Sequence, residues 1–128
     1  MNHIDGVVIM AGTNDLWLRA AAHDIFGGLQ KAYDEVLAYG AFVVAVTIPE
    51  TYESDLNDVR NAVNKEVRHY VAQKRQRSDQ IALFDAQQAF PHTGIRNDLW
   101  SESVHFSHKG YDALGDRIFD VLKENFLR

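Results

Sequence analysis

The sequence lacks cysteine altogether, which excludes disulfide bonds, a thiolate zinc site and a cysteine nucleophile. It also lacks an excess of positive charge. The formal net charge is −5 and the isoelectric point is about 5.6, so binding to a nucleic-acid backbone is not expected. The one basic run, residues 74–77, is interpreted as a solvated helix end. No apolar run approaches the length of a membrane span, and no basic segment precedes a long hydrophobic one at the N-terminus.

What is present is the composition of an ordinary folded domain. Hydrophobic residues make up 46% and charged residues 24% of the 128 residues, which supplies a core and argues against disorder. There is no internal repeat, low-complexity segment or linker. The sequence therefore predicts one domain over residues 1–128.

Three short apolar runs have the length and composition of strands. GVVIMA at residues 6–11 precedes the turn-prone segment Gly12–Asp15, AFVVAVTI at 41–48 is closed by Pro49, and IALF at 81–84 ends at Asp85. Each run is continuous rather than alternating, which is typical of strands buried on both faces.

Amphipathic segments alternate with these runs. Residues 21–39 predict a helix that ends at Gly40, with an apolar face formed by Ile25, Phe26, Leu29, Tyr33, Val36 and Leu37. Ser54 or Asp55 is expected to cap a second helix, whose inward face is Leu56, Val59, Val63, Val67, Tyr70 and Val71. Residues 87–106 are expected to be irregular. Ser107 is then expected to cap a last helix, with Tyr111, Leu114, Ile118, Val121 and Leu122 facing inward.

This order, β-α-β-α-β-loop-α, predicts an α/β layered fold with parallel strands joined by right-handed crossovers. Three strands make a thin sheet with two bare edges. Because the first strand begins almost at Met1, we expect structure to be missing before it. The 6–11 strand would then be a flat hydrophobic edge that invites self-association or aggregation.

In an open parallel sheet, functional residues collect beyond the carboxyl ends of the strands. Those ends carry Gly12–Asp15, residues 47–50 and Asp85, and the loop before the last helix could return His105 to the same rim. Asn14 and His105 are therefore expected to converge.

Each of these two residues has a chemical role in acyl transfer. The Asn14 amide can donate to a developing oxyanion. His105 can take a proton from a hydroxyl nucleophile and return it to the leaving group, while Glu102 could orient the imidazole.

Other interpretations stay open at this point. Asn14 and Asp15 could form a simple turn, and a histidine before a helix is often structural. The spacing Glu102-x-x-His105-x-x-His108 could indicate a metal site, although no further ligand lies at a telling spacing. Gly27-Gly28 lies inside a predicted helix, so it does not suggest a phosphate-binding loop.

Two segments resemble conserved blocks of the SGNH, or GDSL-type, hydrolases. DGVVIMAGTNDL, from Asp5, resembles their third block, a hydrophobic strand followed by Gly-x-Asn-Asp. ESVHFSHKGYDALGDRIF, from Glu102, resembles their fifth block, usually Asp-x-x-His before a polar turn and a helix. The pair in this order is more specific than either block alone, and the resemblance covers Asp5 to the C-terminus.

This resemblance implies a serine esterase or lipase on a three-layer, flavodoxin-like α/β/α fold, with no metal or organic cofactor. By motif match, Asn14 takes the position of the oxyanion-hole asparagine, in the turn that starts at Gly12. His105 takes the position of the general base. Glu102 takes that of the triad acid, where the family usually has aspartate, and Asp98 is a weaker substitute.

The family's nucleophile block, a Gly-Asp-Ser turn after the first strand, has no counterpart here, and neither does the glycine of the second block. None of the serines follows a strand in such a turn; they are Ser54, Ser78, Ser101, Ser103 and Ser107. The chain thus resembles the C-terminal part of an SGNH hydrolase that lacks its N-terminal strand–helix–strand.

The leading hypothesis is a carboxylic ester hydrolase for small esters, inactive as residues 1–128 alone, without a nucleic-acid partner or a membrane span. The alternative is a non-catalytic interaction protein, a pseudoenzyme, that associates through the open sheet edge. A flavodoxin-like nucleotide binder is a third possibility. Acyl length and cellular compartment are not encoded in these motifs.

Overall fold

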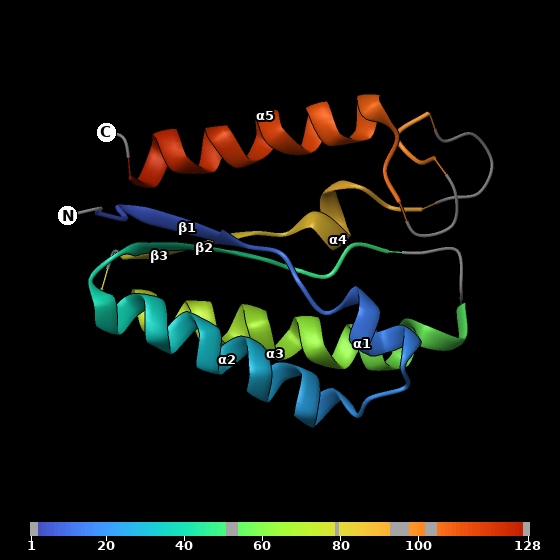
Figure 1. The fold of residues 1–128 in the computed structure, drawn as a ribbon, viewed down its shortest axis with the longest axis horizontal. Helices are drawn as coiled ribbons and strands as arrows, with labels where there is room; N and C mark the ends of the chain where they lie inside the picture. Colours follow the sequence, from blue (N-terminus) through green and yellow to red (C-terminus); the bar gives the residue numbers. More distant parts are fainter. Residues whose placement is uncertain (1–2, 51–53, 79, 93–97, 102–104, 127–128) are drawn as a thin grey trace.

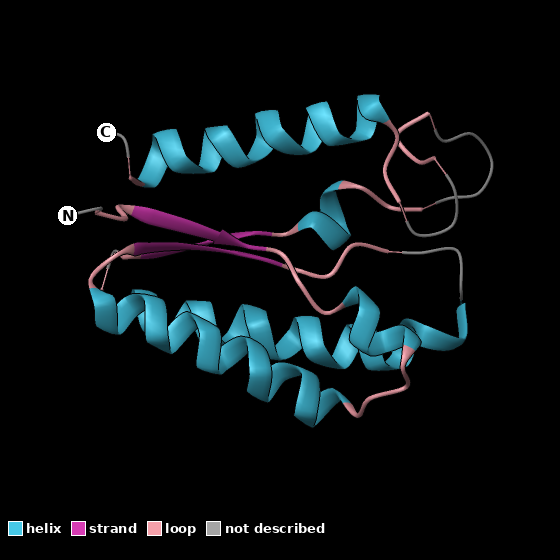
Figure 2. Ribbon diagram, in the orientation of Figure 1, coloured by secondary structure: helices cyan, strands magenta, loops and turns pink. Residues whose placement is uncertain are grey.

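A computed structural model of the protein describes residues 3–50, 54–78, 80–92, 98–101 and 105–126. The elements follow in the order β1 (Gly6–Ile9), α1 (Thr13–Trp17), α2 (Ala22–Tyr39), β2 (Phe42–Val46), the 3-10 turn η1 (Ser54–Leu56), α3 (Asn57–Arg75), β3 (Ile81–Phe84), α4 (Ala86–Ala89) and α5 (His108–Asn125). Figure 1 shows three layers, with α2 and α3 on one face of the sheet and α5 on the other. The predicted α/β/α arrangement is confirmed. The strands point toward the end of the molecule where α1 and α4 lie (Figure 2).

The sheet has the order β1-β2-β3, and both strand pairs are parallel. All residues of β2 are buried, as its continuous apolar run predicts. Their side chains alternate between two cores. Val43 and Ala45 pack with the α2 and α3 layer, whereas Phe42, Val44 and Val46 pack with residues of α4 and α5.

The first strand corrects a prediction. The GVVIMA run predicts a strand over residues 6–11 that is buried on both faces, but β1 ends at Ile9 and alternates between exposed and half-buried residues. The reason is its position, because β1 is an edge strand that pairs only with β2 among the described strands. The expected hydrophobic edge is present, since Val8 and Met10 are each 41% exposed.

The helices on the lower face begin and end for identifiable reasons. Gly40 has a φ of 94° and donates its N–H to the carbonyl of Leu37 at 3.0 Å, so α2 ends as predicted. The expected cap at Ser54 or Asp55 is wrong. The chain forms η1 there, and Leu56 occupies the cap position of α3 without a side-chain hydrogen bond. Leu56 is only 2% exposed, so a packed apolar residue, rather than a polar cap, starts this helix.

The last helix begins at the predicted cap. The Ser107 hydroxyl accepts from the N–H of Gly110 at 3.1 Å and donates to the carbonyl of Asp98 at 2.5 Å. The inward placement of Tyr111 is wrong, since this side chain is 49% exposed. It lies at the side of the apolar stripe, where its ring meets that of Phe106 edge-on, with centroids 5.5 Å apart.

Two short helices were not indicated by the sequence. α1 replaces the expected turn after β1, and α4 replaces the start of the expected irregular region. Helices of five and four residues are too short to show a helical period. The only sequence signal for α4 is Asp85, whose carboxylate accepts from the N–H of Gln88 at 3.2 Å.

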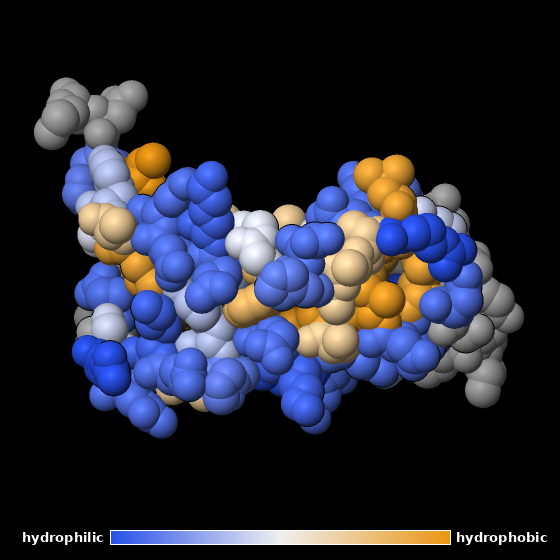
Figure 3. Space-filling model, turned by 90° about the horizontal axis from the view of Figure 1, so that it is seen from below, coloured by the Kyte–Doolittle hydropathy of each residue, from blue (hydrophilic) through white to orange (hydrophobic). Residues whose placement is uncertain are grey.

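The outer face of the α2 and α3 layer is mostly hydrophilic, with hydrophobic surface gathered toward the end where α1 lies (Figure 3). Exposed apolar side chains at that end include Trp17, at 39%, and Leu18, at 80%. In the part of the chain that the structure describes, no helix combines the length and apolar character needed to cross a membrane.

Candidate active site

A pocket of about 560 Å³ lies at the carboxyl ends of β1 and β2. Three distant parts of the chain line it: residues 10–15 with Trp17 after β1, Pro49 and Glu50 after β2, and His105 and Phe106 with Tyr111 around the start of α5. The structure therefore places Gly12, Asn14 and His105 around one cavity.

Gly12 fixes the turn that carries Asn14. Its φ of 115° lies in the left-handed region, which residues other than glycine rarely adopt. A Cβ atom at this position would lie 2.7 Å from Cδ1 of Ile48 and 3.5 Å from Cγ2 of Ile25. The Gly12 carbonyl accepts from the N–H of Leu16 at 3.1 Å, which starts α1. Asn14 follows in the first turn of α1, with an exposed side chain.

His105 is held on a short antiparallel bridge between Trp100 and Phe106. The carbonyl of His105 accepts from the N–H of Ser101 at 2.8 Å, and the N–H of Ser107 donates to the carbonyl of Leu99 at 2.9 Å. The rings of Trp100 and Phe106 stack beneath the bridge with centroids 4.3 Å apart. The bridge and the stacked rings anchor this loop, while His105 itself is exposed at the pocket rim.

Gly110 permits the bridge to sit against α5. A Cβ atom on Gly110 would lie 1.9 Å from the carbonyl oxygen of Leu99 and 2.9 Å from Cδ1 of Phe106. A side chain does not fit at position 110, because the nearest atom in its way is the backbone carbonyl oxygen of Leu99. The glycine immediately before Tyr111 is therefore a requirement of the loop that carries His105.

Asp85, predicted at the same rim, does not line the pocket. Its carboxylate accepts from the Thr47 hydroxyl at 2.9 Å and from Arg68, through Nε at 2.7 Å and a terminal nitrogen at 3.0 Å. Burial raises the pKa of Asp85, but the hydrogen bonds from Arg68 and Thr47 outweigh burial and leave this pKa below its ordinary value. Asp85 thus ties the end of β3 to β2 and α3 and is a structural anion.

The predicted triad acid, Glu102, lies outside the described residues, as does Ser103. The substitute acid Asp98 forms an ion pair with Lys109, with 2.5 Å between carboxylate oxygen and Nζ. Among the residues that the structure describes, no group of three or more histidine and acidic side chains is arranged to hold a metal ion.

The pocket also contains side chains to which the sequence analysis gave no catalytic role. Trp17, Phe106 and Tyr111 give it an aromatic wall, and Glu50 contributes a carboxylate. Glu50 accepts from the backbone N–H of His92 at 3.2 Å. Its position just after a strand end was the available signal. No sequence signal indicated the aromatic wall, because it depends on how α1 and α5 approach each other.

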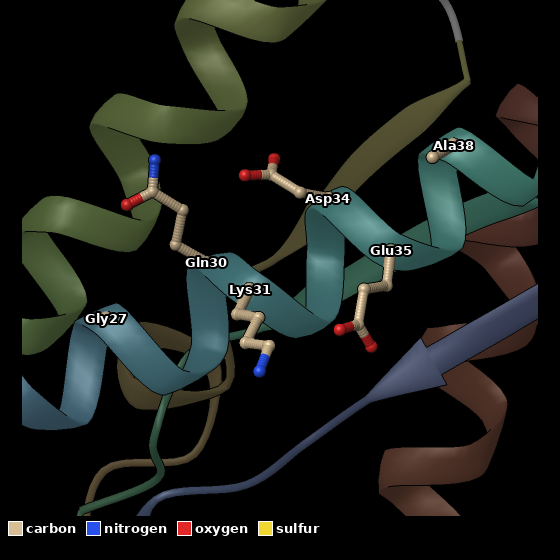
Figure 4. Close-up of a pocket in the computed structure, with 6 residues that line it drawn as sticks. All are labelled: Gly27, Gln30, Lys31, Asp34, Glu35 and Ala38. Carbon is tan, nitrogen blue, oxygen red and sulfur yellow. The ribbon is translucent and has the colours of Figure 1, made fainter.

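A second hollow, of about 380 Å³, lies on the outer surface of α2 (Figure 4). Gln30 and Asp34 extend to the side of α3, and Lys31 and Glu35 to the opposite side. Asp34 accepts a hydrogen bond from the hydroxyl of Tyr70. These side chains diverge and lie away from the strand ends, so this hollow is not the candidate site.

The chain matches the model of the GDSL-like lipase/acylhydrolase family over residues 2–113. It belongs to this family. No curated protein matches the sequence. Two solved structures are similar in fold to this GDSL-family chain. One is a member of the lipolytic protein G-D-S-L family from Veillonella parvula DSM 2008, with a TM-score of 0.75 and 22% identity over 92% of this chain and 63% of that one.

The other is a Streptococcus pneumonia protein named after platelet activating factor, with a TM-score of 0.64 and 17% identity over 92% of this chain and 59% of that one. At these identities the likeness shows the fold alone. The GDSL-family chain described here spans about 60% of the length of each of the two solved structures.

Proposed function

We propose that the pocket is part of a carboxylic ester hydrolase site of the SGNH type, with Asn14 as oxyanion donor and His105 as general base. The observation that carries this proposal is that these two residues, from opposite ends of the sequence, line one pocket in a GDSL-family chain. The aromatic wall and Met10 offer apolar contact for an acyl group.

In the proposed reaction His105 first accepts a proton and then donates it, in each of two successive steps. A serine hydroxyl attacks the carbonyl carbon of the ester while His105 takes its proton. The carbonyl oxygen becomes an oxyanion that accepts a hydrogen bond from the Asn14 amide. The bond to the alcohol then breaks, and the alcohol leaves with the proton from His105. Water repeats the two steps on the acyl-enzyme and releases the acid. Glu102 is proposed to orient the imidazole.

The nucleophile is proposed to come from a Gly-Asp-Ser segment that residues 1–128 do not contain. Ser107 is a poor substitute, because its hydroxyl accepts from Gly110 and donates to Asp98 as a helix cap. In this proposal residues 1–128 are part of a single SGNH domain and do not hydrolyse esters by themselves.

The first measurement is the intact mass of the protein purified from its source. A mass well above the 14.5 kDa of these residues identifies the longer chain to assay, with p-nitrophenyl acetate and butyrate as substrates. In that protein His105→Ala should lower kcat by about 10³-fold or more. His108→Ala is the matched control, since His108 does not line the pocket, and it should stay near wild type. Unchanged hydrolysis in His105→Ala would refute the assignment.

A second candidate, a non-catalytic interaction protein, is favoured by the edge of β1. Val8 of β1 is 41% exposed, as is Met10 just after the strand, and Ile4 before it is 52% exposed; none of the four residues of β1 is charged. This function requires a monodisperse dimer or complex that Val8→Lys disrupts, measured by size-exclusion chromatography with light scattering. A protein that is monomeric, or that only aggregates, would contradict it.

A further inference from the structure

Asn64 of α3 is a fully buried polar residue, with 0% exposure. Its side-chain amide forms hydrogen bonds with both the backbone N–H and the backbone carbonyl of Ile48. Its Oδ1 accepts from the N–H of Ile48 at 2.8 Å, and its Nδ2 donates to the carbonyl of Ile48 at 2.9 Å. Ile48 lies past the end of β2, so Asn64 supplies the two bonds that a neighbouring strand would supply. The remaining Nδ2 hydrogen goes to Oε1 of Gln87 at 2.8 Å, which fixes the orientation of the amide.

Ile48 in turn supports the turn after β1. Ile48 is 1% exposed, and its Cδ1 and Cγ1 would lie only 2.7 and 3.2 Å from a Cβ atom on Gly12, so the glycine rests directly on this side chain. Gly12 caps α1, which carries Asn14. The residues that follow Ile48, Pro49 and Glu50, form another wall of the pocket.

We propose that Asn64 is a positioning residue for the pocket, which holds Ile48 and through it sets the place of Gly12 and Asn14. Asn64 does not line the pocket, so its proposed effect on the pocket is transmitted through Ile48. The catalytic consequence rests on the proposed function, because it needs Asn14 to donate to the oxyanion. The structural consequence does not, because it concerns only the turn at Gly12–Asp15.

The test compares Asn64→Ala with Asn61→Ala in the full-length protein. Asn61 lies on the same helix and is exposed, and it accepts only a side-chain hydrogen bond from Gln87 among the bonds described here. Amide hydrogen exchange at Leu16 and Leu18, whose N–H groups donate to the carbonyls of Gly12 and Asn14, should become at least about tenfold faster in Asn64→Ala, while exchange in α5 stays unchanged. In Asn61→Ala both should stay at the wild-type rate.

Kinetics give the second readout. Asn64→Ala should lower kcat by about tenfold or more and change KM by less than about threefold, because a displaced oxyanion donor is lost mainly in the transition state. Asn64→Asp keeps an acceptor for the N–H of Ile48 but turns a carboxylate oxygen toward the carbonyl of Ile48 and Oε1 of Gln87, so it should lower kcat at least as much as Asn64→Ala. A loss of stability with unchanged kinetic constants and unchanged exchange at Leu16 and Leu18 would overturn the proposal.

The test still decides if Asn64→Ala does not fold or if the wild-type protein has no esterase activity. If Asn64→Ala does not fold, Ile48→Val removes the Cδ1 atom that supports Gly12 and repeats the test with a small volume change. Faster exchange at Leu16 and Leu18 then supports the proposal and unchanged exchange overturns it. If the wild-type protein hydrolyses no ester, the proposed function fails, and the exchange comparison still decides the role of Asn64.

Discussion

Replacing Gly110 with alanine should disturb the loop that carries His105. Alanine normally favours a helix over glycine by about 1 kcal/mol. Here its Cβ atom would lie 1.9 Å from the carbonyl oxygen and 2.9 Å from the carbonyl carbon of Leu99. Since backbone cannot move aside as a flexible side chain can, either α5 or the bridge between Trp100 and Phe106 must shift.

The magnitude follows from these contacts. Overpacking of this kind costs about 1–3 kcal/mol. Weakening the two hydrogen bonds beside the bridge, from Ser101 to His105 and from Ser107 to Leu99, adds about 0.5–1.5 kcal/mol each. After the helix preference of alanine is subtracted, Gly110→Ala should lower the free energy of unfolding by roughly 1–5 kcal/mol.

Gly115→Ala is the matched control, because it lies in the same helix and nothing would lie within 4 Å of its Cβ atom. It should raise stability by about 0.5–1 kcal/mol. Urea denaturation followed by circular dichroism measures both variants. Activity of Gly110→Ala should also fall at temperatures where the protein is still folded. If Gly110→Ala is as stable as Gly115→Ala, the close approach of α5 to Leu99 is wrong, and so is our account of how His105 is held.

Three further changes test other parts of the structure. Gly12→Ala should destabilise by about 2 kcal/mol or more in thermal melts, because it combines a φ of 115° with a 2.7 Å contact to Ile48. Asp85→Asn should cost about 1.5–3 kcal/mol at neutral pH. The pKa of Asp85 is lower in the folded state, so its stabilisation is present above the unfolded value near 3.9 and is lost as pH falls through the folded value; urea titrations should show the variant approaching wild type below about pH 4. Tyr33→Phe should be neutral or stabilising by up to about 1 kcal/mol in thermal melts, since the buried hydroxyl has no hydrogen-bond partner among the described residues and burial raises the pKa of Tyr33 to about 12.

The parts of the fold that the sequence predicted well are those with a repeated local signal. The IALF run gave the third strand with its observed ends, and the helix face from Ile25 to Leu37 matched α2 up to Gly40. The errors occur where tertiary contacts decide. Burial of Leu56 moved the start of α3, and the edge position of β1 exposed residues whose composition predicts burial.

For the site, spacing and position indicated which residues share the pocket but not how they are held. Asn14 and His105 could be placed at one rim because parallel strands end on the same side. The support under them is non-local. Asn64 reaches Ile48 from a helix, and Gly110 admits the backbone of Leu99. A single sequence carries no signal for such pairs, because their residues are ordinary until the fold brings them together. Whether Glu102 completes the site stays a prediction.

The alternating burial of β2 has a consequence for how this protein can change over evolutionary time. Val43 and Val44 are adjacent in sequence, yet each belongs to a different core, on opposite faces of the sheet. Because the two side chains pack in different clusters, substitutions at Val43 and Val44 should be coupled through the strand backbone rather than through shared packing, and we expect their effects on stability to add more closely than those of two substitutions within one core. Each layer of helices can therefore diverge with its own face of β2 while the other is left intact. The lower layer, which contains Ile48 and Asn64, can be kept constant while the α5 side is remodelled.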